Sequence, residues 1–105
     1  MDILKWLENW YSSNCDGDWE HLYGIKIGTL DNPGWSVEIN LLETVLEDRG
    51  FERIKIDNSD DDWVFCWVEE GKFNGAGDPG KLTVILEIFR KWAQQAQTTS
   101  VENDG

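Results

Sequence analysis

The sequence predicts a single α+β domain, an antiparallel sheet of four to five strands with an N-terminal and a C-terminal helix packed on one face. Apolar residues recur at spacings of three and four over residues 3–11 and again over 82–92, which indicates a helix near each end of the chain. Between these helices, apolar and polar residues alternate as they do in half-buried strands. Because each helix has one broad apolar face, both need the same sheet as cover.

The first helix is expected to begin after Asp2, whose side chain can cap it, and to end near the polar residues 12–14. Residues 15–18 (Cys-Asp-Gly-Asp) follow it, and glycine and aspartate at these positions predict a tight polar turn. The helix therefore leads through a short turn into the sheet.

A hairpin is expected next, with strands over residues 21–29 and 35–41 and a turn at residues 31–34 (Asp-Asn-Pro-Gly). One face of the hairpin is apolar, and it consists of Tyr23, Ile25, Ile27, Trp35, Val37, Ile39 and Leu41. This face is predicted to pack against the helices.

The middle of the chain is less regular. Within residues 42–50 we expect a short strand around 44–46 and then an acidic turn, and alternation predicts another strand over 51–57. Residues 63–68 are apolar on both faces, which is typical of a central strand covered on both sides or of an edge strand with exposed aromatic rings.

Residues 71–80 contain four glycines and one proline and are expected to form a loop. Helical spacing returns over residues 81–97 and closes the core. We expect the domain to span residues 1–97 and the polar residues 98–105 to form a disordered acidic tail.

The charge of the chain limits its partners. Nine Lys and Arg residues against 21 Asp and Glu residues give a net charge of −12 over 105 residues. A charge of this size repels nucleic acid and anionic membranes and raises encounter rates with cationic partners. We therefore expect neither nucleic acid nor a membrane as a partner, although an acidic surface can also serve solubility alone.

The sequence predicts a cytoplasmic protein, because no apolar run approaches the roughly 20 residues of a membrane span and the first residues lack the layout of a signal peptide. Two cysteines, Cys15 and Cys66, are too far apart in sequence for a CxxC motif. Both are expected to remain thiols that pack as small apolar groups.

The densest polar cluster holds Asp16, Asp18, Glu20 and His21, the single histidine of the chain. Alternate carboxylates are typical of the start of a calcium loop, but the remainder of that motif is missing, so a capped turn is the alternative interpretation. No nucleophile motif accompanies the histidine. We expect no enzymatic activity, no cofactor and no metal.

Three tryptophans, Trp19, Trp35 and Trp63, have polar sequence neighbours. Such rings can be exposed binding hot spots beside carboxylates, since tryptophan is enriched at such positions. They can equally belong to the core, and the sequence leaves both interpretations open.

Several motifs together resemble one known family. They are Trp10-Tyr11, residues 15–21 (Cys-Asp-Gly-Asp-Trp-Glu-His), Tyr23-Gly24, residues 29–35 (Thr-Leu-Asp-Asn-Pro-Gly-Trp), Asp61-Asp62-Trp63, Cys66, residues 73–77 (Phe-Asn-Gly-Ala-Gly), and Ile85, Leu86, Phe89 and Trp92 in the last helix. In this order, over roughly residues 1–93, the chain resembles the immunity protein 53 family of bacterial polymorphic toxin systems.

The resemblance implies an immunity protein that binds and neutralises a cognate toxin domain made by the same or a neighbouring cell. From the charge we infer that this toxin has a basic surface, as a nuclease has. The expected partner-binding residues are Asp16, Asp18, Trp19, Glu20, His21, Asp31, Asn32 and Trp35. The oligomeric state is left open.

Two other functions remain open at this point. One is a small metal-binding module or metal-assisted hydrolase that uses Asp16, Asp18, Glu20 and His21. The other is an acidic adaptor protein that has no toxin as its partner.

Overall fold

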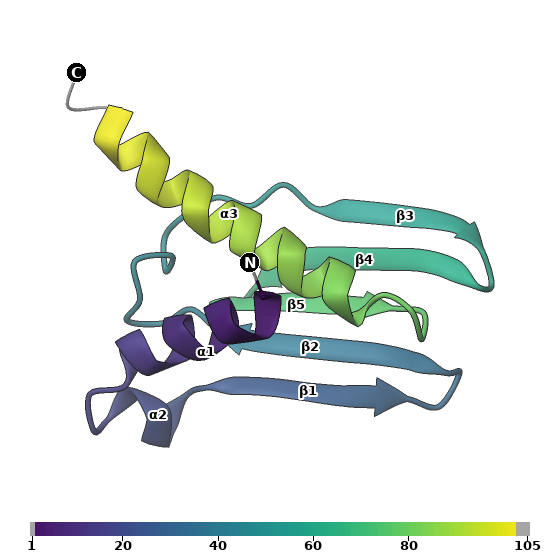
Figure 1. Ribbon diagram of the computed structural model, residues 1–105, viewed down its shortest axis with the longest axis horizontal. Helices are drawn as coiled ribbons and strands as arrows, with labels where there is room; N and C mark the ends of the chain where they lie inside the picture. Colours follow the sequence, from purple (N-terminus) through teal and green to yellow (C-terminus); the bar gives the residue numbers. More distant parts are fainter. Residues whose placement is uncertain (1, 103–105) are drawn as a thin grey trace.

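A five-stranded antiparallel sheet carries two long helices on one face (Figure 1), which confirms the predicted fold class. The computed structural model describes residues 2–102, with side chains described up to residue 95. The elements in chain order are α1 (Ile3–Asn14), α2 (Trp19–Leu22), β1 (Ile25–Leu30), β2 (Gly34–Asn40), β3 (Ile54–Ser59), β4 (Asp62–Glu69), β5 (Lys72–Gly77) and α3 (Leu82–Glu102). In space the strands follow the order β1-β2-β5-β4-β3.

Helix α1 forms as predicted. The Asp2 side chain caps it by accepting a hydrogen bond of 3.0 Å from the Leu4 backbone N–H, and the helix ends at Asn14. Its rings pack on α3, where Trp6 and Trp10 make edge contacts with Phe89 at centroid distances of 5.9 and 5.0 Å. These contacts hold α1 on the same face of the sheet as α3.

The prediction of a loop over residues 71–80 is wrong, because residues 72–77 form β5, the middle strand of the sheet. The glycines serve close packing here. A Cβ atom at Gly75 would lie 2.4 Å from Cγ2 of Ile85, and one at Gly77 would lie 2.7 Å from Cβ of Lys81. Glycine in this strand therefore allows α3 to approach the sheet closely.

Two further predictions are corrected by the structure. The strand expected to start at residue 21 starts at Ile25, because residues 19–22 form the short helix α2. No strand forms at residues 44–46, which lie in a series of turns. There the Thr44 hydroxyl donates to the Leu41 carbonyl at 2.7 Å and accepts from the backbone N–H of the buried Leu46 at 3.1 Å.

Strand β4 lies inside the sheet between β5 and β3. Its alternate residues Val64 and Cys66 are buried under the helices, so Trp63, Phe65 and Trp67 lie on the opposite face. We call this opposite face the open face, since no helix or strand of residues 2–102 covers it (Figure 1). The strand is thus interior but carries half-buried rings.

The predicted domain boundary at residue 97 and the tail over residues 98–105 stay predictions. The described backbone of α3 is helical to Glu102, and residues 103–105 lie outside the described part of the chain. No helix among the described residues is sufficiently long and apolar to span a bilayer.

Candidate partner-binding site

The loop before α2 is held by its own carboxylates. Asp16 Oδ1 accepts hydrogen bonds of 2.9 Å from the backbone N–H groups of Asp18 and Trp19. The two oxygens of Glu20 accept from the N–H groups of Asp16 and Gly17 at 2.9 and 2.8 Å. The N–H groups of Trp19 and Asp18 lower the pKa of Asp16, because they stabilise its charged form. This is the capped turn that the sequence left open.

Trp19 belongs to the core. Its ring is 1% exposed, and its indole N–H donates to the Leu42 carbonyl at 2.9 Å. The ring also makes edge contacts with Trp10 and Tyr11 at 6.0 and 5.8 Å. Of the two interpretations of Trp19, the structure supports the buried one, so this ring anchors α2 and offers no surface to a partner.

Trp35 and Trp63 are half-buried. The Trp35 indole N–H donates to the Pro79 carbonyl at 2.9 Å, beside the loop that enters α3. The Trp63 ring lies on the open face, 5.4 Å from the Phe65 ring. Each ring therefore contributes to packing while part of it remains accessible.

The eight predicted residues do not form one surface. Those around α2 lie at one end of β1, whereas Asp31, Asn32 and Trp35 lie at the β1–β2 turn at its other end (Figure 1). Strand β1 has six residues, so its length separates the two groups by about 17 Å. The structure brings Asp16, Asp18, Glu20 and His21 together and leaves the turn group apart.

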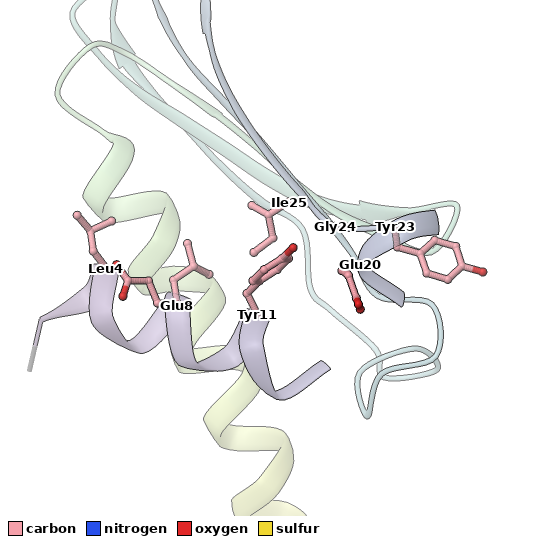
Figure 2. A pocket seen from close by; sticks show the side chains of 8 residues that line it. Leu4, Glu8, Tyr11, Glu20, Tyr23, Gly24 and Ile25 are labelled. Carbon is pink, nitrogen blue, oxygen red and sulfur yellow. The ribbon is translucent and has the colours of Figure 1, made fainter. Parts of the chain in front are cut away.

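A cleft opens between α1 and the segment that links α2 to β1, and we call it the α1–β1 cleft (Figure 2). Its volume is about 510 Å³. The lining residues are Leu4, Leu7, Glu8, Tyr11, Glu20, Tyr23, Gly24 and Ile25. The cleft exists because β1 is an edge strand that α1 covers incompletely, which leaves Ile27 42% exposed on the same side of the strand as Ile25.

The α1 side of the cleft was not predicted from the sequence. Leu4, Glu8 and Tyr11 follow one another at spacings of four and three, which places them on one face of the helix. Leu4 is 54% and Tyr11 is 37% exposed. The sequence signal for this side of the cleft is that the apolar face of α1 is wider than the part of it that packs on α3.

The cleft combines an apolar floor with an acidic rim. Glu8 pairs with the equally exposed Lys5 at 3.4 Å, and such surface pairs contribute little. On the far side, partial burial and the negative charge of Glu43 raise the pKa of Tyr23, whose hydroxyl donates to Glu43 at 3.3 Å. Tyr23 therefore stays protonated at neutral pH.

The sequence model of immunity protein 53 matches residues 4–94 of this chain. The chain belongs to the immunity protein 53 family. The match confirms the resemblance seen in the sequence motifs, and it spans both walls of the α1–β1 cleft. No curated protein and no solved structure gives a significant match.

In this immunity protein, two of the four side chains suggested for a metal, Asp16 and Glu20, make local hydrogen bonds. Asp16 and Glu20 direct their oxygens at backbone N–H groups of their own loop, which is the role of capping residues. Among the described residues, no group of three or more His, Cys, Asp and Glu side chains could hold a metal ion. The geometry gives the metal-dependent alternatives no support.

The two cysteines of this immunity protein are free thiols in different surroundings. Cys66 is fully buried, and burial raises the pKa of its thiol to about 12. Cys15 is half-buried, and its Sγ donates to the Tyr11 carbonyl at 3.3 Å. Cys66 is therefore not a thiolate nucleophile at neutral pH.

Proposed function

We propose that this immunity protein neutralises a cognate toxin domain by binding it in the α1–β1 cleft. The observation that carries the proposal is the combination of an apolar floor with two carboxylates, Glu8 and Glu20, in one cleft of about 510 Å³. Membership of the family supports a protein toxin as the partner.

An apolar side chain of the toxin would contact Leu4, Tyr11 and Ile25 and remove their exposed surface from water. A lysine or arginine beside it would meet Glu8 or Glu20. Although both oxygens of Glu20 already accept backbone hydrogen bonds, each carboxylate oxygen has a second lone pair for the partner. The cleft thus fits a segment that carries an apolar and a basic side chain.

The net charge of −12 supports a toxin with a basic surface, because opposite charges raise association rates. A toxin that acts on nucleic acid needs such a surface to hold phosphates, so a nuclease domain fits this description. Neutralisation would occur in the cytoplasm, where such a toxin finds its substrate. The immunity protein acts by binding the toxin and covering its functional surface, without catalysis or a bound cofactor.

The test is the binding of the toxin domain encoded beside this protein to cleft variants. Leu4→Ala and Tyr11→Ala remove apolar anchors, and each should weaken binding by about 2 kcal/mol, or roughly 30-fold in Kd, mainly through faster dissociation. Glu8→Gln should mainly slow association at low salt. Surface plasmon resonance measures both rates, and a melting curve of each free variant shows that it is folded.

Two substitutions provide matched controls. Asp31→Asn removes one charge at the other end of β1, and Val45→Ala trims an apolar side chain that is 75% exposed outside the cleft. Both should bind like the parent. If Asp31→Asn slows association and the cleft variants do not, the toxin docks at the β1–β2 turn. If co-expression does not protect cells from the toxin, the acidic adaptor is the better account.

A further inference from the structure

The open face carries a ridge of aromatic rings along β4. Trp63, Phe65 and Trp67 alternate with buried residues and are each half-buried. The Trp63 and Phe65 rings are 5.4 Å apart, and Lys55 Nζ lies 5.9 Å from the centre of the Phe65 ring. Three large aromatic rings on one strand of an uncovered sheet face form a contiguous apolar patch, and such patches mark interaction surfaces.

A trough of small residues lies beside this ridge. The strand register places Gly28 of β1, Ser36 of β2 and Ala76 of β5 in one row that continues to Phe65. Gly34 of β2 lies in the next row, against the Trp63 ring. The open face is therefore high along β4 and low where the row of Gly28, Ser36 and Ala76 and the neighbouring Gly34 cross β1, β2 and β5.

The charge of the open face differs from that of the whole chain. Its charged side chains on the strands are three lysines and three carboxylates, namely Lys26, Lys55, Lys72, Glu38, Asp57 and Glu69. Lys72 and Glu38 pair across the face at 3.8 Å. The −12 charge of the chain thus lies elsewhere, and a basic partner is not steered to this face.

We propose that the open face binds a second copy of this chain. A two-fold axis parallel to the strands and passing near β5 would set Trp63 and Phe65 of each copy over Gly34 and Ser36 of the other, because β2 and β4 flank β5. The strands of the two sheets would then be nearly aligned, as in a sandwich. Because each chain carries a net charge of −12, contact through the neutral open face causes the least electrostatic repulsion between two copies.

The available area suits a weak dimer. Five strands at a spacing of about 4.8 Å and a length of about 20 Å give roughly 500 Å² per copy, or about 1,000 Å² for the pair. This is at the lower limit for a specific interface, so the Kd is expected in the micromolar range. The α1–β1 cleft is lined by α1, which lies on the other face of the sheet, so the cleft remains accessible in both copies.

Salt dependence gives the dimer a distinctive signature. Raising salt from about 0.05 to 0.5 M shortens the Debye length from roughly 14 to 4 Å and screens the repulsion between two acidic chains. Self-association should therefore strengthen with salt, whereas association with a basic toxin should weaken. Sedimentation equilibrium of the full chain over a concentration series measures the first effect directly.

The variant Gly28→Lys tests the trough without disturbing the fold, because a Cβ atom there meets only Ser36 Oγ at an ordinary 3.6 Å. It should weaken self-association at least tenfold, since its ammonium would face Lys55 of the other copy. Val45→Lys adds the same charge outside the open face and should dimerise like the parent. Phe65→Ser removes the centre of the ridge and should be monomeric, with a melting curve as its folding control.

The proposal is overturned if the parent stays monomeric into the millimolar range at high salt. It is also overturned if Gly28→Lys self-associates as strongly as Val45→Lys, or if salt weakens the dimer. Toxin binding by the cleft stands or falls separately, because Gly28→Lys leaves the lining of the cleft unchanged.

Discussion

Asp78 is buried, with 3% of its surface exposed, and three hydrogen-bond donors stabilise its negative charge. Lys81 Nζ donates at 2.6 Å, and the backbone N–H groups of Trp63 and Gly80 donate at 2.9 and 2.8 Å. These bonds, led by that of Lys81, lower the pKa of Asp78 from 3.8 to about 2. The carboxylate joins the start of β4 to the loop that enters α3.

This lowered pKa predicts how stability depends on pH. Because the folded form binds the proton more weakly than the unfolded form, Asp78 contributes its full stabilisation above about pH 4 and loses it as the pH falls towards 2. The melting temperature of the parent should fall as the pH drops from 4 to 2. The melting temperature of Asp78→Asn should be lower than that of the parent at neutral pH and should fall less between pH 4 and 2.

Asp31→Asn is the control for this measurement, because it removes an exposed carboxylate at a turn. Its melting curve should follow that of the parent at every pH. Equal pH profiles for Asp78→Asn and the parent would show that the network around Lys81 does not depend on the charge of Asp78.

At the scale of elements, β5 depends on the absence of a side chain at Gly75. Ala at this position should destabilise the protein by about 1–3 kcal/mol, because its Cβ would meet Ile85 Cγ2 at 2.4 Å in a packed interface. Urea unfolding measures the difference. Gly28→Ala, also in a strand, has room and should be neutral or stabilising by up to about 1 kcal/mol. Equal effects of the two changes would contradict close packing of α3 on β5.

The elements with clear periodicity were predicted from the sequence, and those that depend on distant partners were not. Helix α1, the β1–β2 turn and α3 form where apolar spacing and turn residues place them, whereas β1 starts at Ile25 and not at residue 21. Strand β5 was missed because its glycines are required by a helix further along the chain, which no local pattern shows. Helix α2 was missed because a contact with Leu42, 23 residues away, buries Trp19.

The candidate site was predicted only on one side. The acidic residues around α2 were singled out from the sequence, and Glu20 does line the cleft. The turn group with Asp31 was expected to bind the same partner as the acidic residues around α2, but the length of β1 separates the two groups. Leu4 and Tyr11 belong to the apolar face of residues 3–11 that was expected to pack on the sheet, but both are exposed, because helical spacing does not show which part of a broad apolar face remains uncovered.

At the scale of the whole molecule, the two faces of the sheet have different characters. The face with the helices ends in a cleft whose rim is acidic, and the open face is neutral and aromatic. A chain with a net charge of −12 can therefore attract a basic protein to the α1–β1 cleft and bind a second copy through the open face. Raising salt should weaken the first association and strengthen the second.

Hydrogen–deuterium exchange of the complex shows whether the toxin binds in the α1–β1 cleft, as proposed. Slower exchange is predicted for the amides of residues 4–11 and 20–27, which form the two walls, with β4 unchanged. Protection confined to residues 31–35 or to the β4 strand, with the cleft amides exchanging as in the free protein, would contradict the claim.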